Sequence, residues 1–199
     1  DNLRGLIDVI NQKAIIYSEE DFGINYTVEE IPSEFREEAA LALEELINAV
    51  ADKDETIADC ILEDRPIEPE TLKNAIRRLT CNLEMVPVIG GSAFKNKGVQ
   101  PLVDAVIDYL PSPLDIPPAQ GHDVDDPDKL LKIAADDNER FCSLAFKLWT
   151  DQFAGKLVFY RVYRGNLKKG DIIVNPRTGK KERVSRLMKI AADKRVDIE

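Results

Sequence analysis

The spacing of the apolar residues changes once along this chain. Up to Leu110 they mostly recur three and four residues apart, as in helices, and beyond Glu139 they form short runs separated by turn residues, as in strands. Residues 113–138, between these regions, hold four of the eleven prolines and many aspartates, which marks a boundary or an exposed linker. The sequence therefore predicts an α+β unit followed by an antiparallel β unit.

The first unit begins with predicted strands and continues with helices. Residues 3–17 and 24–31 are rich in β-branched and aromatic residues, and Asp21-Phe22-Gly23 predicts a turn between them. Ser33 is a candidate helix cap, and a second, shorter helix is expected over about 54–63. Apolar residues at helical spacing then predict one core-facing stripe in the first helix (Phe35, Ala39, Leu43, Leu46, Ile47, Val50) and one in a helix that starts at Pro69 (Leu72, Ile76, Leu79).

A strand, a glycine loop and a helix are expected next. The apolar run 85–89 predicts the strand, 90–98 the loop, and Val99, Leu102, Val103, Val106 and Leu110 the buried face of the helix. Beyond Glu139, strands are predicted over 141–150, 155–163, 171–174 and 182–190. These are too few to close a barrel, so we expect either an incomplete barrel or one that residues outside this chain complete.

Composition excludes several classes of site. Cys60, Cys81 and Cys142 are far apart and form no CxxC pair, so neither a disulfide framework nor a thiolate metal site is indicated, and a reducing compartment fits best. His122 is the one histidine, which excludes multi-histidine metal sites. No apolar run approaches the ~20 residues needed to cross a bilayer, and no signal peptide is evident. The lack of an initiating Met predicts a piece of a longer chain.

Charge is distributed unevenly over the net −10 of the chain. Residues 1–89 hold 8 Lys and Arg against 21 Asp and Glu, or −13; residues 90–139 amount to −6; and residues 140–199 hold 15 against 6, or +9. Surface charge of this kind steers association, so either the two ends meet partners of opposite sign or both are simply solvated surfaces of separate domains.

The string from Gly91 to Gln100, GSAFKNKGVQ, followed after Pro101 by LVDAVIDYLPSP, resembles the last guanine-nucleotide signature and the following helix of bacterial-type elongation factor G, the ribosomal translocase GTPase of bacteria and organelles. Three further groups of residues resemble that family: Gly5-Leu6-Ile7-Asp8 with Lys13-Ala14 and Glu30-Ile31-Pro32; Asp151 to Leu157; and Arg161 to Gly165 with Lys169-Gly170-Asp171. The resemblance covers nearly the whole chain.

The resemblance implies a mixed α+β and α/β architecture. Residues 1–85 would be the insertion subdomain of a P-loop GTPase domain, 86–113 the end of that domain, 114–139 a linker, and 140–199 the start of an antiparallel translation-factor β-barrel. It further implies that Ser92, Ala93 and Phe94 bind guanine, with the Ala93 N–H reaching O6 of the purine. Adenine has an amino donor at that position, so it would leave two donors facing each other.

Some parts of the family's nucleotide site are missing from the sequence. No G-x-x-x-x-G-K-[ST] string and no D-x-x-G occur, and the nearest match to N-K-x-D is Asn96-Lys97-Gly98-Val99, with valine in place of the carboxylate. Phosphoryl transfer depends on charge neutralisation at the phosphates. We therefore expect GTP and Mg²⁺ in the longer protein, neither bound to this chain alone, and no GTP hydrolysis by this chain.

The basic end is the candidate RNA surface. By the resemblance, the second domain faces rRNA, with Lys180, Lys181 and Arg183 as the chosen contacts. The wider set of candidates comprises Arg161, Arg164, Lys168, Lys169, Arg177 and Arg186. The acidic front would meet the ribosomal stalk protein. The resemblance implies that the partner is the ribosome, through its rRNA and its stalk protein, and that no membrane is involved. It also implies a location in the cytoplasm or an organellar matrix. We expect a monomer.

Two other functions compete with a fragment of a translocase. One is a stand-alone adaptor that binds the ribosome or RNA and needs no nucleotide. The other is a related release-factor or ribosome-protection GTPase, whose string would differ around Phe94-Lys95-Asn96. The reading frame upstream of Asp1 separates the first two, because a P-loop and an N-K-x-D motif there would indicate a fragment.

Overall fold

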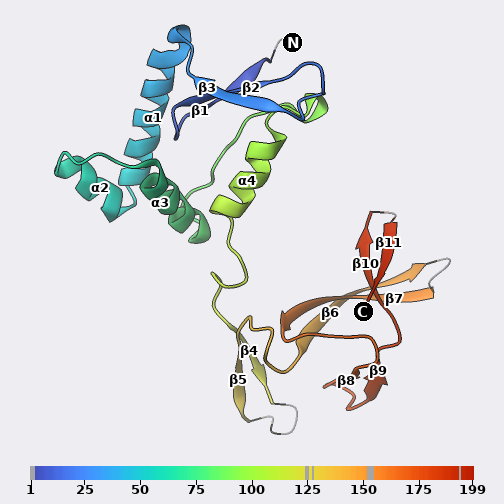
Figure 1. Ribbon diagram of the computed structural model, residues 1–199. Helices are drawn as coiled ribbons and strands as arrows, with labels where there is room; N and C mark the ends of the chain where they lie inside the picture. Colours follow the sequence, from blue (N-terminus) through green and yellow to red (C-terminus); the bar gives the residue numbers. More distant parts are fainter. Residues whose placement is uncertain (1–2, 124–125, 127, 152–154, 193) are drawn as a thin grey trace. The chain divides into compact units, whose positions relative to one another are not determined.

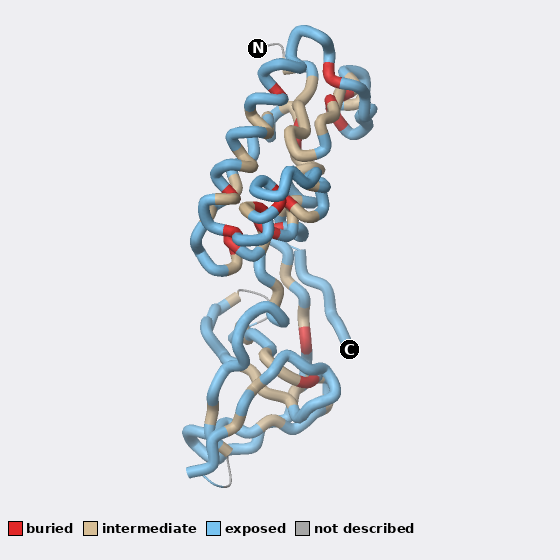
Figure 2. The backbone as a smooth tube through the Cα atoms, turned by 90° about the vertical axis from the view of Figure 1, so that its left-hand side faces the viewer, coloured by how far each residue is buried: buried red, intermediate tan, exposed pale blue. Residues whose placement is uncertain are grey.

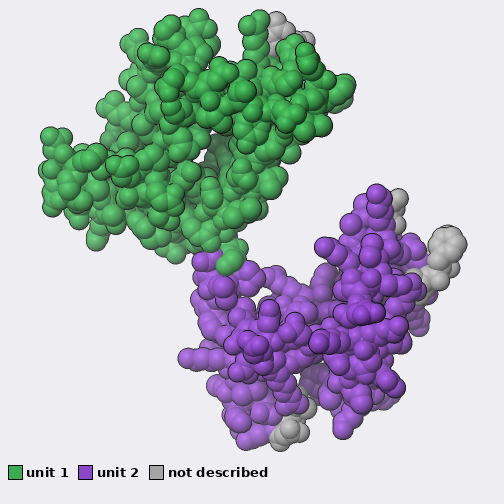
Figure 3. Space-filling model, viewed as in Figure 1, with its two compact units in different colours: residues 1–112 green, residues 113–199 purple. Residues whose placement is uncertain are grey.

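A computed structural model describes residues 3–123, 126, 128–151, 155–192 and 194–199. The chain divides into two compact units, Asp1–Ser112 and Pro113–Glu199 (Figure 3). Buried residues are concentrated in the first unit (Figure 2). Gln152, Phe153 and Ala154, which belong to one of the strings used for the family resemblance, lie outside the described residues.

The first unit starts with a three-stranded antiparallel sheet, β1 Gly5–Asp8, β2 Lys13–Tyr17 and β3 Tyr26–Glu30, in that order (Figure 1). The stretch 3–17, expected to be extended throughout, contains a turn between β1 and β2. Asp8 accepts a hydrogen bond from the Asn11 amide at 3.0 Å, and Gln12 has a φ of 52°. An Asp side chain that bonds to nearby backbone amides favours turns, which explains the break.

Helices follow the sheet at the predicted places. They are η1 Ser33–Phe35, α1 Arg36–Ala51, α2 Glu55–Leu62, α3 Pro69–Cys81 and, after the glycine loop, η2 Ala93–Lys95 and α4 Val99–Tyr109. Pro69 takes the first position of α3, where the missing N–H costs nothing. The expected cap at Ser33 is wrong, because Ser33 lies inside η1 and no side chain caps α1.

The core of this unit lies among the helices. Its buried members are Val50, Ile57, Leu72, Ala75, Ile76, Leu79 and Tyr109. The prediction for the face of α4 is wrong: Tyr109 is buried and Ala105 packs against the core, whereas Leu102, Val103 and Val106 are 49–55% exposed. An apolar stripe shows that a helix has a face to cover, and it does not say which neighbour covers it.

The predicted strand over 85–89 is absent. These residues have no assigned secondary structure, and Val86 and Val88 are 80% and 92% exposed. A strand exists only by hydrogen bonding to a neighbour, and none of the described strands pairs with this segment. The apolar run therefore leads into the glycine loop as an unpaired segment.

The second unit consists of antiparallel hairpins. They are β4 Ala119–His122 with β5 Leu130–Ile133, β6 Cys142–Asp151 with β7 Gly155–Arg164, β8 Ile172–Val174 with β9 Lys181–Arg183, and β10 Leu187–Ala191 with β11 Lys194–Ile198. The single strand expected over 182–190 is two strands, one in each of two hairpins. Among the described residues these hairpins do not close into a barrel, and β4 and β5 lie inside the segment interpreted as a linker.

Candidate functional site

A tight loop between the apolar segment and α4 forms the centre of the candidate site. Ser92 and Lys97 close it as an isolated antiparallel bridge, with Ser92 N donating to Lys97 O at 2.7 Å and Lys97 N donating to Ser92 O at 3.0 Å. Glycine is required on both sides: a Cβ on Gly91 would lie 2.8 Å from Lys97 O, and Gly98 has a φ of 89°. The backbone of Ala93–Asn96 is thus held in one compact turn.

The three predicted guanine-binding residues occupy this turn in different ways. The Ser92 amide is already engaged by Lys97 O, so it is not a free donor. The Ala93 amide has no hydrogen-bond partner among the described residues, and Ala93 is exposed. Phe94 is 99% exposed. Of the two backbone donors in the Ser-Ala pair, only that of Ala93 is therefore available to a ligand.

The loop stands beside a groove and does not line it. The groove has a volume of about 1020 Å³ and lies between the sheet, the segment 85–90 and α4, with mostly apolar residues along it. Gly90 lines this groove, whereas Ser92, Ala93 and Phe94 do not. The loop offers the Ala93 N–H and the exposed Phe94 ring to a ligand, and any wall facing them must come from other residues.

The fit of a guanine nucleotide to these residues is limited to the base. An exposed N–H suits the O6 acceptor of guanine. No described group of three His, Cys, Asp or Glu side chains is placed to hold a metal ion, and the sequence has no phosphate-binding string. Among the described residues of the loop, the Ala93 N–H is a donor that suits guanine O6, and the sequence has no phosphate-binding string to go with it.

Side chains at the end of the loop and at the start of α4 form hydrogen bonds with residues far away in the sequence. Lys97 is 7% exposed, and its Nζ donates to Leu3 O at 2.9 Å. Gln100 Nε2 donates to Gly23 O at 3.0 Å, in the turn between β2 and β3. Burial raises the pKa of Tyr17, the last residue of β2, whose hydroxyl is buried and has no hydrogen-bond partner among the described residues. The sheet and the loop are thus parts of one local structure.

The predicted RNA contacts lie on one hairpin of the second unit. Lys181 and Arg183 are two residues apart on β9, on the same face, and pair with Val174 and Ile172 of β8. Lys180 directly precedes β9, and all three basic residues are exposed. None of the three forms an ion pair with a described carboxylate. Their charges are available to a partner.

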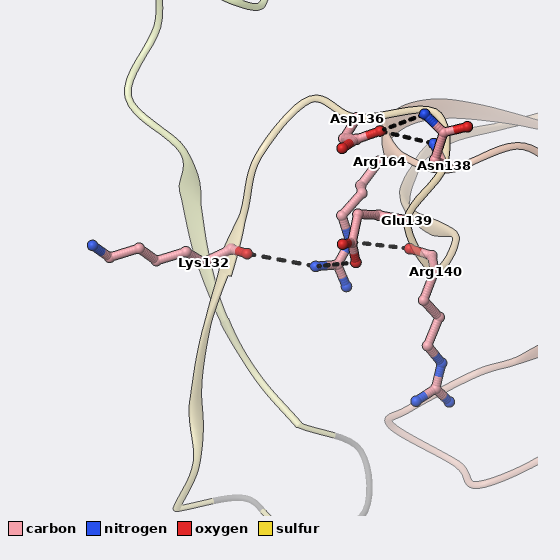
Figure 4. A network of polar contacts seen from close by, with 6 residues as sticks. All are labelled: Lys132, Asp136, Asn138, Glu139, Arg140 and Arg164. Carbon is pink, nitrogen blue, oxygen red and sulfur yellow. Dashed lines mark hydrogen bonds and ion pairs between the residues drawn. The ribbon is translucent and has the colours of Figure 1, made fainter.

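Two residues of the wider basic set have internal partners instead. Arg164 Nε donates to Arg140 O at 3.0 Å, and its Nη1 lies 3.9 Å from Glu139 Oε2 (Figure 4). The Arg164 side chain is only 14% exposed, which leaves little of it for RNA contact, and it joins the end of β7 to the loop before β6. Arg186 donates to both carboxylate oxygens of Asp197, at 2.6 and 3.0 Å.

Sequence reasoning missed Lys97, Gln100 and Gly23 as parts of the site. Their contacts join residues 77 and 94 positions apart, and local spacing contains no signal of such pairs. The available signal was weaker: a glycine in the 21–23 turn and a lysine between two residues that favour left-handed backbone.

Within the described part of the chain, no helix is long and apolar enough to span a membrane.

Comparison with known proteins agrees with this architecture. Residues 155–199 match the family model for elongation factor Tu domain 2. The crystal structure of ttk003000868 from Thermus thermophilus matches 98% of this chain with a TM-score of 0.71 and 26% sequence identity. The chain spans about a quarter, 26%, of the length of that Thermus protein.

These matches show what the two parts of the chain are similar to. The strands from β7 to β11 are similar in sequence to elongation factor Tu domain 2, and the fold along nearly the whole chain resembles that of the Thermus protein. The chain thus has a translation elongation factor-like domain at residues 155–199, preceded in the sequence by the α+β unit that carries the glycine loop.

Proposed function

We propose that this chain is part of an elongation factor of the translocase type, elongation factor G. The observation that supports it most directly is the order of its parts: a glycine loop with a free Ala93 amide comes first, and an elongation factor Tu domain 2 follows. In this proposal the longer protein binds and hydrolyses GTP with Mg²⁺ on the ribosome, moves tRNA and mRNA, and works in the cytoplasm or an organellar matrix.

Within this proposal, the role of this chain in the nucleotide site is recognition of the base. The Ala93 N–H donates to guanine O6, and Phe94 lies at the edge of the pocket. Calorimetric titration of the chain with GTP should give a dissociation constant of about 1 mM or weaker, because the phosphate contacts are absent. A micromolar constant would contradict the assignment of the phosphates to residues outside this chain.

The second role is contact with the ribosome. The exposed carboxylates of α1 (Glu37, Glu38, Glu44, Glu45) support an interaction with a basic surface such as that of a stalk protein. The free cations of Lys180, Lys181 and Arg183 support contact with rRNA phosphates. The logarithm of the binding constant falls linearly with the logarithm of the salt concentration. Each phosphate contact that is lost should make this slope less steep by up to about 0.9.

Replacing Lys180, Lys181 and Arg183 together by alanine tests the RNA contact. We expect binding to an rRNA fragment to weaken, and the salt slope to fall by about 2–3, measured by fluorescence anisotropy at several salt concentrations. The matched control removes three cations from the first unit, Lys53, Arg65 and Lys73, and should leave the slope unchanged. An unchanged slope in the first variant removes these three residues from the interface.

A further inference from the structure

The loop 92–97 depends on Lys97 for its shape. Both main-chain polar groups of Lys97 bond to Ser92, at 2.7 and 3.0 Å, and Asn96 takes a left-handed conformation with a φ of 53°. Ala93 lies inside this closed turn. Lys97 is thus joined to Ser92 by two backbone hydrogen bonds, and Ala93 directly follows Ser92.

The side chain of Lys97 fixes the turn to the start of the sheet. At 7% exposure its ammonium group is mostly withdrawn from water, and Nζ donates to Leu3 O at 2.9 Å. A buried charge without a hydrogen-bond partner is expensive, so this contact is costly to break. Leu3 is 94 positions before Lys97 and is separated only by Arg4 from β1, which begins at Gly5.

Gln100, the second residue of α4, bonds to the 23–24 segment that touches the turn. Its Nε2 donates to Gly23 O at 3.0 Å and lies 3.3 Å from Ile24 O, while its Oε1 is buried with no partner among the described residues. The two carbonyl acceptors therefore determine which way the amide points. Gly23 itself touches the turn, since a Cβ there would lie 2.8 Å from Asn96 O.

We propose that Lys97 and Gln100 are positioning residues, which use the sheet β1–β3 as a support to aim the Ala93 N–H at a purine. This inference rests on the proposed guanine recognition, because it concerns the same loop. Neither side chain touches the base in this account. Each acts through the backbone of the turn, so its loss should affect both the order of the loop and the selectivity for the base.

Hydrogen exchange of the chain tests the support without any ligand. Lys97→Met keeps the aliphatic stem and removes the bond to Leu3 O. We expect the Ser92 amide to exchange about three to ten times faster, which corresponds to the loss of one typical hydrogen bond. Lys53→Met is the matched control, since Lys53 Nζ donates to Glu84 O at 3.0 Å away from the loop, and it should leave Ser92 unchanged. An unchanged rate in Lys97→Met overturns the proposal.

Titration with guanosine 5′-monophosphate and adenosine 5′-monophosphate, followed by amide chemical shifts, tests the aim of the N–H. We expect Lys97→Met and Gln100→Leu to weaken guanosine binding at least about threefold and to reduce the preference over adenosine, with the Lys53→Met variant unaffected. Gln100→Leu serves as the second variant if Lys97→Met unfolds. Equal affinities in all variants overturn the proposal.

The two measurements separate two kinds of failure. If guanosine 5′-monophosphate changes no amide chemical shift of the unaltered chain, the proposed guanine recognition is contradicted. The proposal that Lys97 and Gln100 aim the Ala93 N–H at a purine is then contradicted as well. The exchange rates still decide whether Lys97 supports the loop. If the unaltered chain binds guanosine selectively and the variants do so equally well, the proposed function stands and the positioning role is wrong.

Discussion

At the scale of single residues, a few polar side chains join elements that apolar packing alone would leave loosely oriented. Asp54 is the clearest example, because one of its oxygens accepts from Ile57 N at 3.2 Å and caps α2, while the other accepts from Arg78 of α3 at 2.7 Å. It is 8% exposed. Asp54 therefore sets how α2 and α3 meet at the core.

Replacing Asp54 by alanine should lower the free energy of unfolding by about 1–3 kcal/mol, because a helix cap and a charged hydrogen bond are both lost. Thermal or urea unfolding followed by circular dichroism measures it. Asp52→Ala, at an exposed position in the same connection, should change the stability by less than about 0.5 kcal/mol. Equal effects of the two substitutions would show that Asp54 has no special role.

Tyr109 makes the first unit sensitive to alkali. Burial raises the pKa of Tyr109 from 10.0 to about 12, with a smaller contribution from Asp108. A pKa raised by folding means that the stabilisation is complete below the unfolded value and is lost as the pH rises from about 10 through 12. Tyr109→Phe should remove this part of the pH dependence, at most about 3 kcal/mol, in unfolding curves from pH 9 to 12. A variant with the same alkaline profile as the unaltered chain would contradict this.

At the scale of elements, the hairpins of the second unit are joined by close backbone contacts. Gly165, at the end of β7, has a φ of 72°, and a Cβ there would lie 2.4 Å from Glu139 O and 2.7 Å from Phe141 Cα. Its N–H donates to Asp136 O at 2.8 Å. The loop 136–141 thus packs directly on the end of the long β6–β7 hairpin, as Arg164 next to it also indicates (Figure 4).

Comparing alanine substitutions at Gly165 and Gly179 shows how much the close contact at Gly165 contributes to stability. Gly179 also has a positive φ, 66°, and nothing lies within 4 Å of its missing Cβ. Gly179→Ala should therefore cost only the backbone strain, about 1–2 kcal/mol. Gly165→Ala should cost that strain plus a steric clash, and we expect its loss of stability to be larger by roughly 1 kcal/mol or more, the scale of overpacking. Equal melting temperatures for the two variants would contradict the close approach.

Elements with strong local signals were predicted correctly, and those that depend on a partner were not. The periodic stripes and Pro69 located α1 and α3, because a helix satisfies its own backbone. The apolar run 85–89 has the composition of a strand, but none of the described strands pairs with it by hydrogen bonds. The 182–190 region was divided between two hairpins by the break before Leu187, where local propensity gave no warning.

The same reasoning applies to the candidate site. The string around Ser92, Ala93 and Phe94 identified the loop, since glycines and a left-handed Asn are local features. Its supports at Leu3 and Gly23 come from contacts across 94 and 77 positions, which a single sequence does not reveal. The exposed cations of β9 were predicted by composition, whereas the burial of Arg164 follows only from tertiary packing.

At the scale of the whole molecule, the chain combines two units with opposite charge and different chemistry. The first has the acidic surface, the core and the glycine loop, and the second has the exposed cations of β9 and the residues that match elongation factor Tu domain 2. It spans 26% of the length of the Thermus protein that it resembles. In our account, the phosphate chemistry resides in residues beyond these, and base recognition depends on Ala93.

The shift of the Ala93 amide on addition of nucleotide tests this account most directly. In a titration of the unaltered chain followed by amide chemical shifts, we predict that guanosine 5′-monophosphate moves the Ala93 signal and saturates in the millimolar range or above. Adenosine 5′-monophosphate should leave it in place, because its exocyclic amino group would face the N–H. Identical responses to the two nucleotides, or an Ala93 signal that neither moves, would contradict it.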